Sequence, residues 1–223
     1  MRKNIRCIVK AGFFILMLIL VIVSANCGKS TKPPPPPEPT AAELTAEGWQ
    51  LFESNEFANA KPKFGEALGK DGEYADAYNG RGWCNAFLDL DNEAISDFDS
   101  ANSKGLGKQD AHAGLAGIHV GNQESLSAIN SARTVLSQDS SYQFSHKPAI
   151  DSLDLHLILA QAYYGLGGAY LDSAQQRVDY LNPPNDLDPT NPATWIVSGV
   201  TYDTYAEALL KEIQRLEESI GGY

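Results

Sequence analysis

The chain has 223 residues, of which 43% are hydrophobic, and its formal net charge is −11 at neutral pH. This length suffices for one domain with a buried core. The acidic balance argues against nucleic-acid binding and against electrostatic attachment to anionic lipid, because both of these partners carry negative charge.

The first 26 residues have the order of charged and apolar residues that is typical of a signal peptide. Four basic residues precede an apolar run over residues 11–25: Arg2, Lys3, Arg6 and Lys10. A transmembrane helix needs about 18 or more apolar residues, so we expect cleavage after residue 26, with a short uncleaved anchor as the alternative. Cleavage removes four of the 17 basic residues and none of the 28 acidic ones, which leaves a net charge of −15.

The end of the apolar run resembles the processing box of bacterial lipoproteins, in the sequence Val23-Ser24-Ala25-Asn26-Cys27. This resemblance implies that the Cys27 thiol is lipidated and that the chain is anchored to a membrane of the bacterial cell envelope. In a cell with two membranes we expect the outer membrane, with the protein facing the periplasm. Ser24 and Asn26 depart from the residues usual in this box. The alternative is that Cys27 is an ordinary cysteine beside a secretory cleavage site.

Residues 27–40 form a proline-rich linker, in which five consecutive prolines over 33–37 favour a stiff polyproline spacer. Such a spacer would lift the folded domain off a bilayer, and the alternative is a ligand for a proline-recognising domain. Cys7 leaves with the signal peptide, so no intramolecular disulfide is expected. Cys84 is interpreted as a small packing residue, because nothing nearby supplies the electropositive setting of a reactive thiol.

One 34-residue pattern then occurs three times in succession, beginning at Ala41, Ala75 and Gln109. The eighth position of each unit is small: Gly48, Gly82 and Ala116. The twentieth position is alanine in every unit, and the twenty-fourth is phenylalanine in the first two. A two-helix hairpin explains this pattern. Its first helix needs a small residue where the second helix crosses it, and its second helix needs an apolar stripe for the next hairpin.

The unit resembles the tetratricopeptide repeat (TPR), which has a length of about 34 residues and small residues at the eighth and twentieth positions. The second unit matches best, reading YADAYNGRGWCNAFLDLDNEAISDFDSANSKG from Tyr74, and the resemblance covers residues 41–181. It implies an all-α fold over residues 41–223, a TPR-like helical-hairpin solenoid of about three to four repeats with a C-terminal capping helix. Members of this family usually act as scaffolds that hold other proteins.

The pattern predicts three helix pairs, 42–54 with 57–69, 75–88 with 91–104, and 109–121 with 124–138. Ten inserted residues, at about 143–152, then interrupt the period, and a fourth unit begins at Leu153 with Ala174 as the small residue of its second helix. Four prolines predict an irregular loop over 182–194. An amphipathic helix over 202–220 is expected to cover the last apolar face, and pairing with another protein's helix is the alternative.

The motifs of serine hydrolases, zinc proteases, phosphate-binding loops and paired redox cysteines are absent from the sequence. His112 and His119 lie seven residues apart, on one face of a predicted helix, but no Cys or acidic residue accompanies them at the spacing of metal ligands. We therefore expect no enzymatic activity, no metal site and no cofactor.

In the family that the chain resembles, positions two, five, nine, twelve and thirteen of each first helix line a concave groove. Carried onto this chain, these positions give ten candidate groove residues for binding a partner: Trp49, Phe52, Asp76, Asn79, Trp83, Phe87, Asp110, Asp154, Gln161 and Tyr164. Some members of the family clamp a peptide carboxylate with basic residues, and none of the ten is basic. The resemblance thus implies an aromatic and acidic groove.

Some of these groove residues have structural alternatives. Asp76, Asp110 and Asp154 form a predicted row of carboxylates, but an acid in the first turn of a helix is stabilised by the helix dipole whatever the ligand. Trp49 and Trp83 share the ninth position of adjacent units, where packing between helices competes with contact to a ligand.

The sequence therefore predicts an envelope lipoprotein that acts as a scaffold for other envelope proteins and binds a peptide segment or helix in this groove. Its apolar part would give affinity, and its carboxylates would select neutral or basic segments. The alternative is a lipoprotein that binds a small ligand or glycan, with Trp49, Trp83 and Tyr164 as stacking surfaces.

Overall fold

The computed structural model describes residues 36–105 and 109–220. The chain divides into two units, Met1–Glu38 and Pro39–Tyr223, and nearly all of the described residues belong to the second. The predicted signal peptide over 1–26 and the predicted lipid attachment at Cys27 lie outside the described residues. Within the ranges described, no helix has both the length and the apolar character that a membrane span requires.

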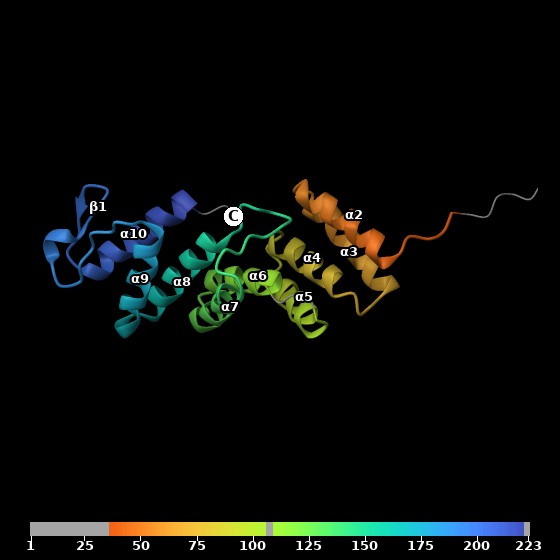
Figure 1. The fold of residues 1–223 in the computed structure, drawn as a ribbon, viewed down its shortest axis with the longest axis horizontal. Coiled ribbons are helices and arrows are strands. Elements are labelled where there is room, and N and C mark those ends of the chain that lie inside the picture. The colour runs from red at the N-terminus through yellow and green to blue at the C-terminus, as the bar shows by residue number, and fades with distance from the viewer. Residues whose placement is uncertain (1–35, 106–108, 221–223) are drawn as a thin grey trace, which may run out of the picture. The chain divides into compact units, whose positions relative to one another are not determined.

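The second unit consists of helical hairpins followed by a single helix (Figure 1). Its helices are, in chain order, α2 (Ala41–Glu53), α3 (Phe57–Lys70), α4 (Ala75–Ala86), α5 (Asp91–Ser103), α6 (Gln109–Gly121), α7 (Ser125–Gln138), α8 (Ser152–Leu166), α9 (Leu171–Leu181) and α10 (Tyr205–Ile220), with short 3-10 helices η1 (Gly168–Tyr170) and η2 (Pro192–Thr194). Each helix packs against the next within the four hairpins, and each hairpin packs against its neighbour. This confirms the predicted all-α, TPR-like solenoid.

The repeat is visible in the turns as well as in the helices. The three predicted starting positions, Ala41 among them, are the first residues of α2, α4 and α6. Between the two helices of each of the first three hairpins, the same left-handed backbone conformation recurs at Asn55, Asp89 and Gln123, with φ values of 60°, 57° and 61°. Asn and Asp adopt this conformation more readily than other residues with a side chain, because their short polar groups bond to the local backbone. The three hairpins therefore share one turn geometry.

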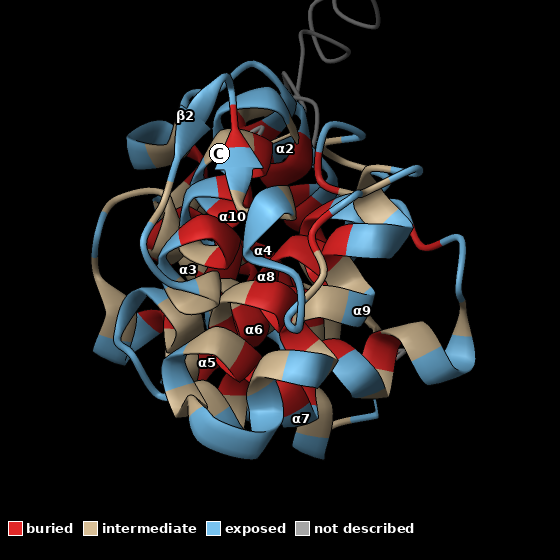
Figure 2. Ribbon diagram, turned by 90° about the vertical axis from the view of Figure 1, so that its left-hand side faces the viewer, coloured by how far each residue is buried: buried red, intermediate tan, exposed pale blue. Residues whose placement is uncertain are grey.

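Phenylalanine rings fill the space between successive hairpins. The Phe64 ring of α3 lies between Gly48 of α2 and Gly80 of α4, where an added Cβ would come within 2.8 Å and 2.2 Å of the ring. Phe98 repeats the arrangement one unit later, again with a glycine on either side. In Figure 2 the buried positions follow the helix faces that pack together. The predicted close crossing at the small eighth position is confirmed for the first two units.

The C-terminal helix covers the end of the stack, as predicted. α10 packs on α8 and α9, and its apolar side chains, such as Leu209 and Ile213, are buried. The helix begins at Tyr205 rather than at 202, because Thr204 caps it: the Thr204 hydroxyl accepts from the Glu207 amide at 3.2 Å. α10 is therefore a structural cap.

The region before α10 contains a short element between the predicted loop over 182–194 and the predicted helix over 202–220, where no structure was predicted. Strands β1 (Ile196–Val197) and β2 (Val200–Thr201) pair antiparallel. Ser198 and Gly199, which join them, both have positive φ, 51° and 80°. A two-residue turn of this kind matches the twist of a hairpin, and the Ser-Gly pair was its only local signal.

Candidate functional site

The first helices of the four hairpins, α2, α4, α6 and α8, pack in a row, and we call the surface they form the first-helix face. The ten predicted groove residues lie on these helices or, for Phe87, at the C-cap of α4. Five of them are buried: Trp49, Phe52, Asn79, Trp83 and Asp154. The other five are partly exposed: Asp76, Phe87, Asp110, Gln161 and Tyr164.

The inserted segment explains much of this burial. Residues 142–151, which we call the strap, lie across the N-terminal half of the first-helix face. The Phe144 ring stacks on Trp83 with centroids 4.5 Å apart and planes at 20°. The His146 ring stacks on Trp49 at 3.8 Å with planes at 1°. Phe144 itself is 0% exposed. The strap thus occupies the place where a bound ligand was predicted.

Polar contacts hold the cationic end of the strap on α2 and on the turn that follows it. His146 Nδ1 lies 2.8 Å from Glu53 Oε1, and Lys147 Nζ donates to Asn55 Oδ1 at 2.8 Å. The Lys147 ammonium also lies over the Phe87 ring, 5.0 Å from its centroid. An ammonium over an aromatic face is attracted by the ring quadrupole. The strap is therefore bound through both aromatic and cationic side chains.

The strap covers the indole faces of Trp49 and Trp83, on which a small ligand or glycan would have to stack in the alternative function. Trp49 is 5% exposed and Trp83 is 2% exposed. Tyr164 lies on α8, away from both indoles in the sequence of repeats, and stays partly exposed. The three aromatic residues do not form one open platform for stacking.

The predicted row of carboxylates lies in the first turns of α4, α6 and α8, as expected, and each member bonds within the chain. Trp49 Nε1 donates to Asp76 at 3.1 Å, and the Tyr142 hydroxyl donates to Asp110 at 2.9 Å. Asp154 accepts from the Asp151 amide at 2.8 Å and completes a capping box. Burial raises the pKa of Asp110, against the opposing effect of the Tyr142 hydrogen bond. These carboxylates support the fold.

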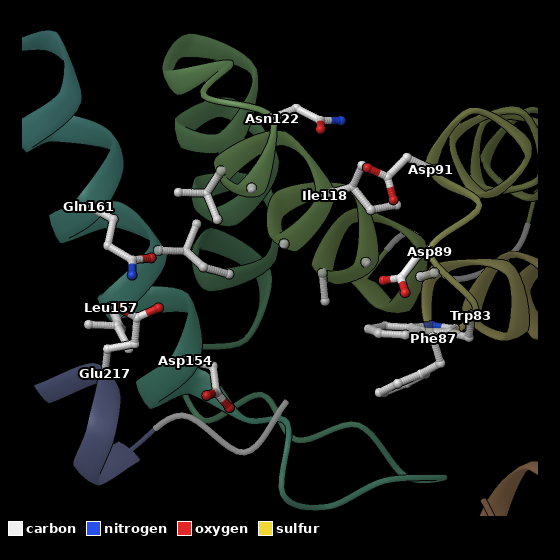
Figure 3. Close-up of a pocket in the computed structure, with 17 residues that line it drawn as sticks. Trp83, Phe87, Asp89, Asp91, Ile118, Asn122, Asp154, Leu157, Gln161 and Glu217 are labelled. Carbon is white, nitrogen blue, oxygen red and sulfur yellow. The ribbon is translucent and has the colours of Figure 1, made fainter. Parts of the chain in front are cut away.

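A second region of the first-helix face is open. A cavity of about 540 Å³ lies over α4, α6 and α8, and we call it the acidic cavity (Figure 3). Four of the predicted groove residues line it: Trp83, Phe87, Asp154 and Gln161. Trp83 and Phe87 are at one end, and Asp154 and Gln161 are at the other.

Further carboxylates and apolar side chains complete the acidic cavity. Asp89 and Asp91 follow α4, and Glu217 reaches the opposite end from α10. Ile118 of α6 and Leu157 of α8 belong to its apolar floor. None of the 17 lining residues is Lys, Arg or His. The cavity therefore combines an apolar floor with a rim of one charge sign.

The sequence analysis missed Asp89, Asp91 and Glu217 for two different reasons. Asp89 lies in the turn after α4 and Asp91 is the first residue of α5, just beyond the helix positions that the family pattern marks. Their signal was the turn itself, since Asp89 has positive φ and so fixes where the chain leaves the helix. Glu217 belongs to the capping helix, outside the repeats, and no repeat position could indicate it.

The buried polar atoms of α4 that have no hydrogen-bond partner among the described residues include Asn79 Oδ1 and Trp83 Nε1. These residues are four apart and thus share one face of the helix. Both are nearly inaccessible, at 1% and 2% exposure. Buried polar groups in folded proteins are nearly always paired, so this pair marks a place where the packing of the first-helix face is incomplete.

Two further candidate groups from the sequence are His119 and Cys84. His119 Nδ1 lies 2.6 Å from Glu124 Oε2, at the exposed end of its helix. In the described parts of the chain, no three His, Cys, Asp or Glu side chains gather as a metal site would need. Burial raises the pKa of the Cys84 thiol to about 12, so it is not ionised at neutral pH.

The hairpin stack is an all-α solenoid with a TPR-like fold. Solved structures of similar fold include YrrB, described as a TPR protein with an unusual peptide-binding site, at a TM-score of 0.57 and 18% identity, over 80% of this chain and 87% of that one. The MamA protein has a TM-score of 0.52 at 16% identity, covering 82% of this chain and 76% of its own. A MamA RS-1 double mutant gives 0.52 at 15% identity, covering 82% and 97%. No family model and no curated protein sequence matches the chain.

Proposed function

We propose that this protein is a scaffold that holds an extended segment of another protein in the acidic cavity, and that the segment carries a cationic residue beside an apolar one. The observation that carries this proposal is the composition of the cavity. It has an apolar floor, an aromatic end at Trp83 and Phe87, and carboxylates without any basic residue in its lining.

The two kinds of surface contribute differently to binding. Apolar area that leaves water supplies most of the affinity, at about 25 cal/mol per Å². The carboxylates supply selectivity, because an acidic segment would meet repulsion at the rim. Asp89 and Glu217 are both exposed to solvent, so a lysine or arginine of the partner can approach them without complete desolvation. The cavity is thus suited to a cationic segment.

Selection from a random library of displayed short peptides tests the proposal. We expect the full-length chain to enrich sequences in which Lys or Arg is next to an aliphatic or aromatic residue. Glu217→Lys should weaken binding of the selected peptides by at least about tenfold, which corresponds to ~1.4 kcal/mol.

Glu218→Lys is the matched control. It makes the same charge change one residue away on α10, and Glu218 is exposed and outside the cavity lining. Equal affinity of the two variants for the selected peptides, or selection without enrichment of cations, would refute binding in the acidic cavity.

The same proposal includes anchoring in the bacterial envelope through Cys27, in the outer membrane of a cell that has two membranes. The basic residues before an apolar run, the cysteine directly after it and the proline-rich spacer support this location. Metabolic labelling with palmitate should be lost in Cys27→Ala and kept in wild type. Label that persists in the variant would contradict lipid attachment at this residue.

A further inference from the structure

The strap is a turn that closes on itself. The Phe144 amide donates to the Ile150 carbonyl at 2.9 Å, and the Ile150 amide donates to the Lys147 carbonyl at 2.9 Å. Among the described residues, no backbone hydrogen bond joins the strap to α2 or α4. The strap is therefore attached to these helices through its side chains, and it can leave the first-helix face without breaking a backbone ladder.

The surface under the strap recognises a particular pattern of side chains. Trp83 receives the aromatic ring of Phe144, and Trp49 receives the ring of His146 two residues later. Glu53 and Asn55 then receive the polar atoms of His146 and Lys147. An aromatic residue followed by an imidazole or cation, and then by an ammonium, is the pattern that this surface fits.

The strap leaves part of this surface unsatisfied. It places the Phe144 ring on Trp83, but Trp83 Nε1 and the neighbouring Asn79 Oδ1 have no partner in the described structure. The peptide backbone of a partner offers a carbonyl for the indole N–H and an amide for the side-chain oxygen. Trp83 and Phe87 also line the acidic cavity, so the two surfaces are continuous.

We propose that the surface under the strap is a second binding surface, which takes a partner segment that turns as the strap does, with an aromatic residue followed three residues later by a lysine or arginine. The strap is its intramolecular competitor, and the partner segment displaces it. This inference rests on the proposed function, because it extends the segment held in the acidic cavity toward α2.

A labelled peptide with the sequence of the strap, YQFSHKPAI, is the probe. We expect it to bind the full-length variant H146A/K147A at least about tenfold more tightly than it binds wild type, because in wild type the tethered strap competes at an effective concentration on the order of millimolar. The variant changes two partly exposed side chains and leaves the surface beneath them intact. A circular dichroism spectrum and a melting curve like those of the wild type would show that the variant is folded.

Two controls define the result. S145A alters an exposed strap residue for which the structure shows no contact with α2 or α4, and it should bind the peptide as weakly as wild type. The same peptide carrying F144A and K147A should not bind H146A/K147A. Equal affinity of wild type and H146A/K147A, or binding of the altered peptide, would overturn the proposal.

Other outcomes separate this inference from the proposed function. Glu217→Lys should leave binding of the strap peptide unchanged, since Glu217 lies at the far end of the acidic cavity from Trp83. If the peptide library showed no enrichment of cations while the strap peptide still bound, only the proposal of binding in the acidic cavity would be refuted. Concentration-dependent dimers of H146A/K147A in light scattering, abolished by excess strap peptide, would assign the surface to a second copy of this chain and overturn the choice of partner.

Discussion

Gly80→Ala should destabilise the stack, although alanine is the better helix former. A Cβ at this position would lie 2.2 Å from Phe64 Cε1 and 2.3 Å from Cζ. The Phe64 ring cannot move away from residue 80, because Gly48 lies close against its other side. A Cβ added at Gly48 would itself lie 2.8 Å from the ring. The ring is 0% exposed and also meets Trp49 edge-on, with centroids 5.1 Å apart.

The expected magnitude follows from two opposing effects. Overpacking of a closed core costs about 1–3 kcal/mol. Replacing glycine in a helix interior returns about 0.8–1 kcal/mol. The net loss in the free energy of unfolding is then up to about 2 kcal/mol, or up to roughly 8 °C in the melting temperature for a chain of this length. Urea and thermal unfolding followed by circular dichroism measure both quantities.

Gly65→Ala is the matched control, since Gly65 lies inside α3 with nothing within 4 Å of an added Cβ. It should stabilise the protein by about 0.5–1 kcal/mol through helix propensity alone. Phe64→Leu should be less destabilising in the Gly80→Ala background than in wild type, because the smaller side chain relieves the overlap. If Gly80→Ala matched Gly65→Ala, or if the double variant were additive, the close crossing would not limit packing here.

Three further predictions concern other buried groups. Cys84 is 0% exposed, and burial raises its pKa to about 12. A thiol reagent should therefore label Cys84 only as fast as the chain unfolds, as measured by site-resolved mass spectrometry. Rapid labelling of the native chain would contradict this. Burial, with a smaller effect of Arg177, lowers the pKa of His156 to about 4, so the folded state disfavours its protonation. Stability present above about pH 6.5 should fall by roughly 1–3 kcal/mol as the pH drops toward 4, and a His156→Gln variant with the same pH profile in urea unfolding would disprove the assignment. Trp49→Phe removes the hydrogen bond to Asp76 and should lower the free energy of unfolding by about 0.5–1.5 kcal/mol. A double-mutant cycle with Asp76→Ala that finds no coupling between the two residues would contradict this.

Much of the fold was predictable because the repeat encodes local structure and nearest-neighbour packing together. A small residue at Gly48 and a ring at Phe64 imply each other across one hairpin, and the same pair recurs 34 residues later. Helix starts and the fourth unit follow from the repeat, and the capping helix follows from the helical spacing of its own apolar residues, which is why the predicted helices agree closely with the observed ones.

The candidate site was only partly predictable because it depends on contacts between distant parts of the chain. The family positions placed Trp49 and Trp83 on the first-helix face, but no local signal showed that Phe144 and His146 would cover them. The insertion was predicted from the break in the repeat period, but the surface on which it packs was not predicted. Glu217 reaches the cavity from a helix that has no place in the repeat. Whether the ten groove residues contact a partner remains a prediction.

The strap also changes how the protein would carry a mechanical load. In a plain array of repeats, tension applied at the N-terminal linker peels off the first hairpin, because only one interface holds it. Here His146 bonds to Glu53 and Lys147 to Asn55 across 93 and 92 residues of sequence. A pulling force on α2 therefore acts also on the strap, which connects the third hairpin to α8. Separation of the first hairpin under tension also requires that these two strap contacts break.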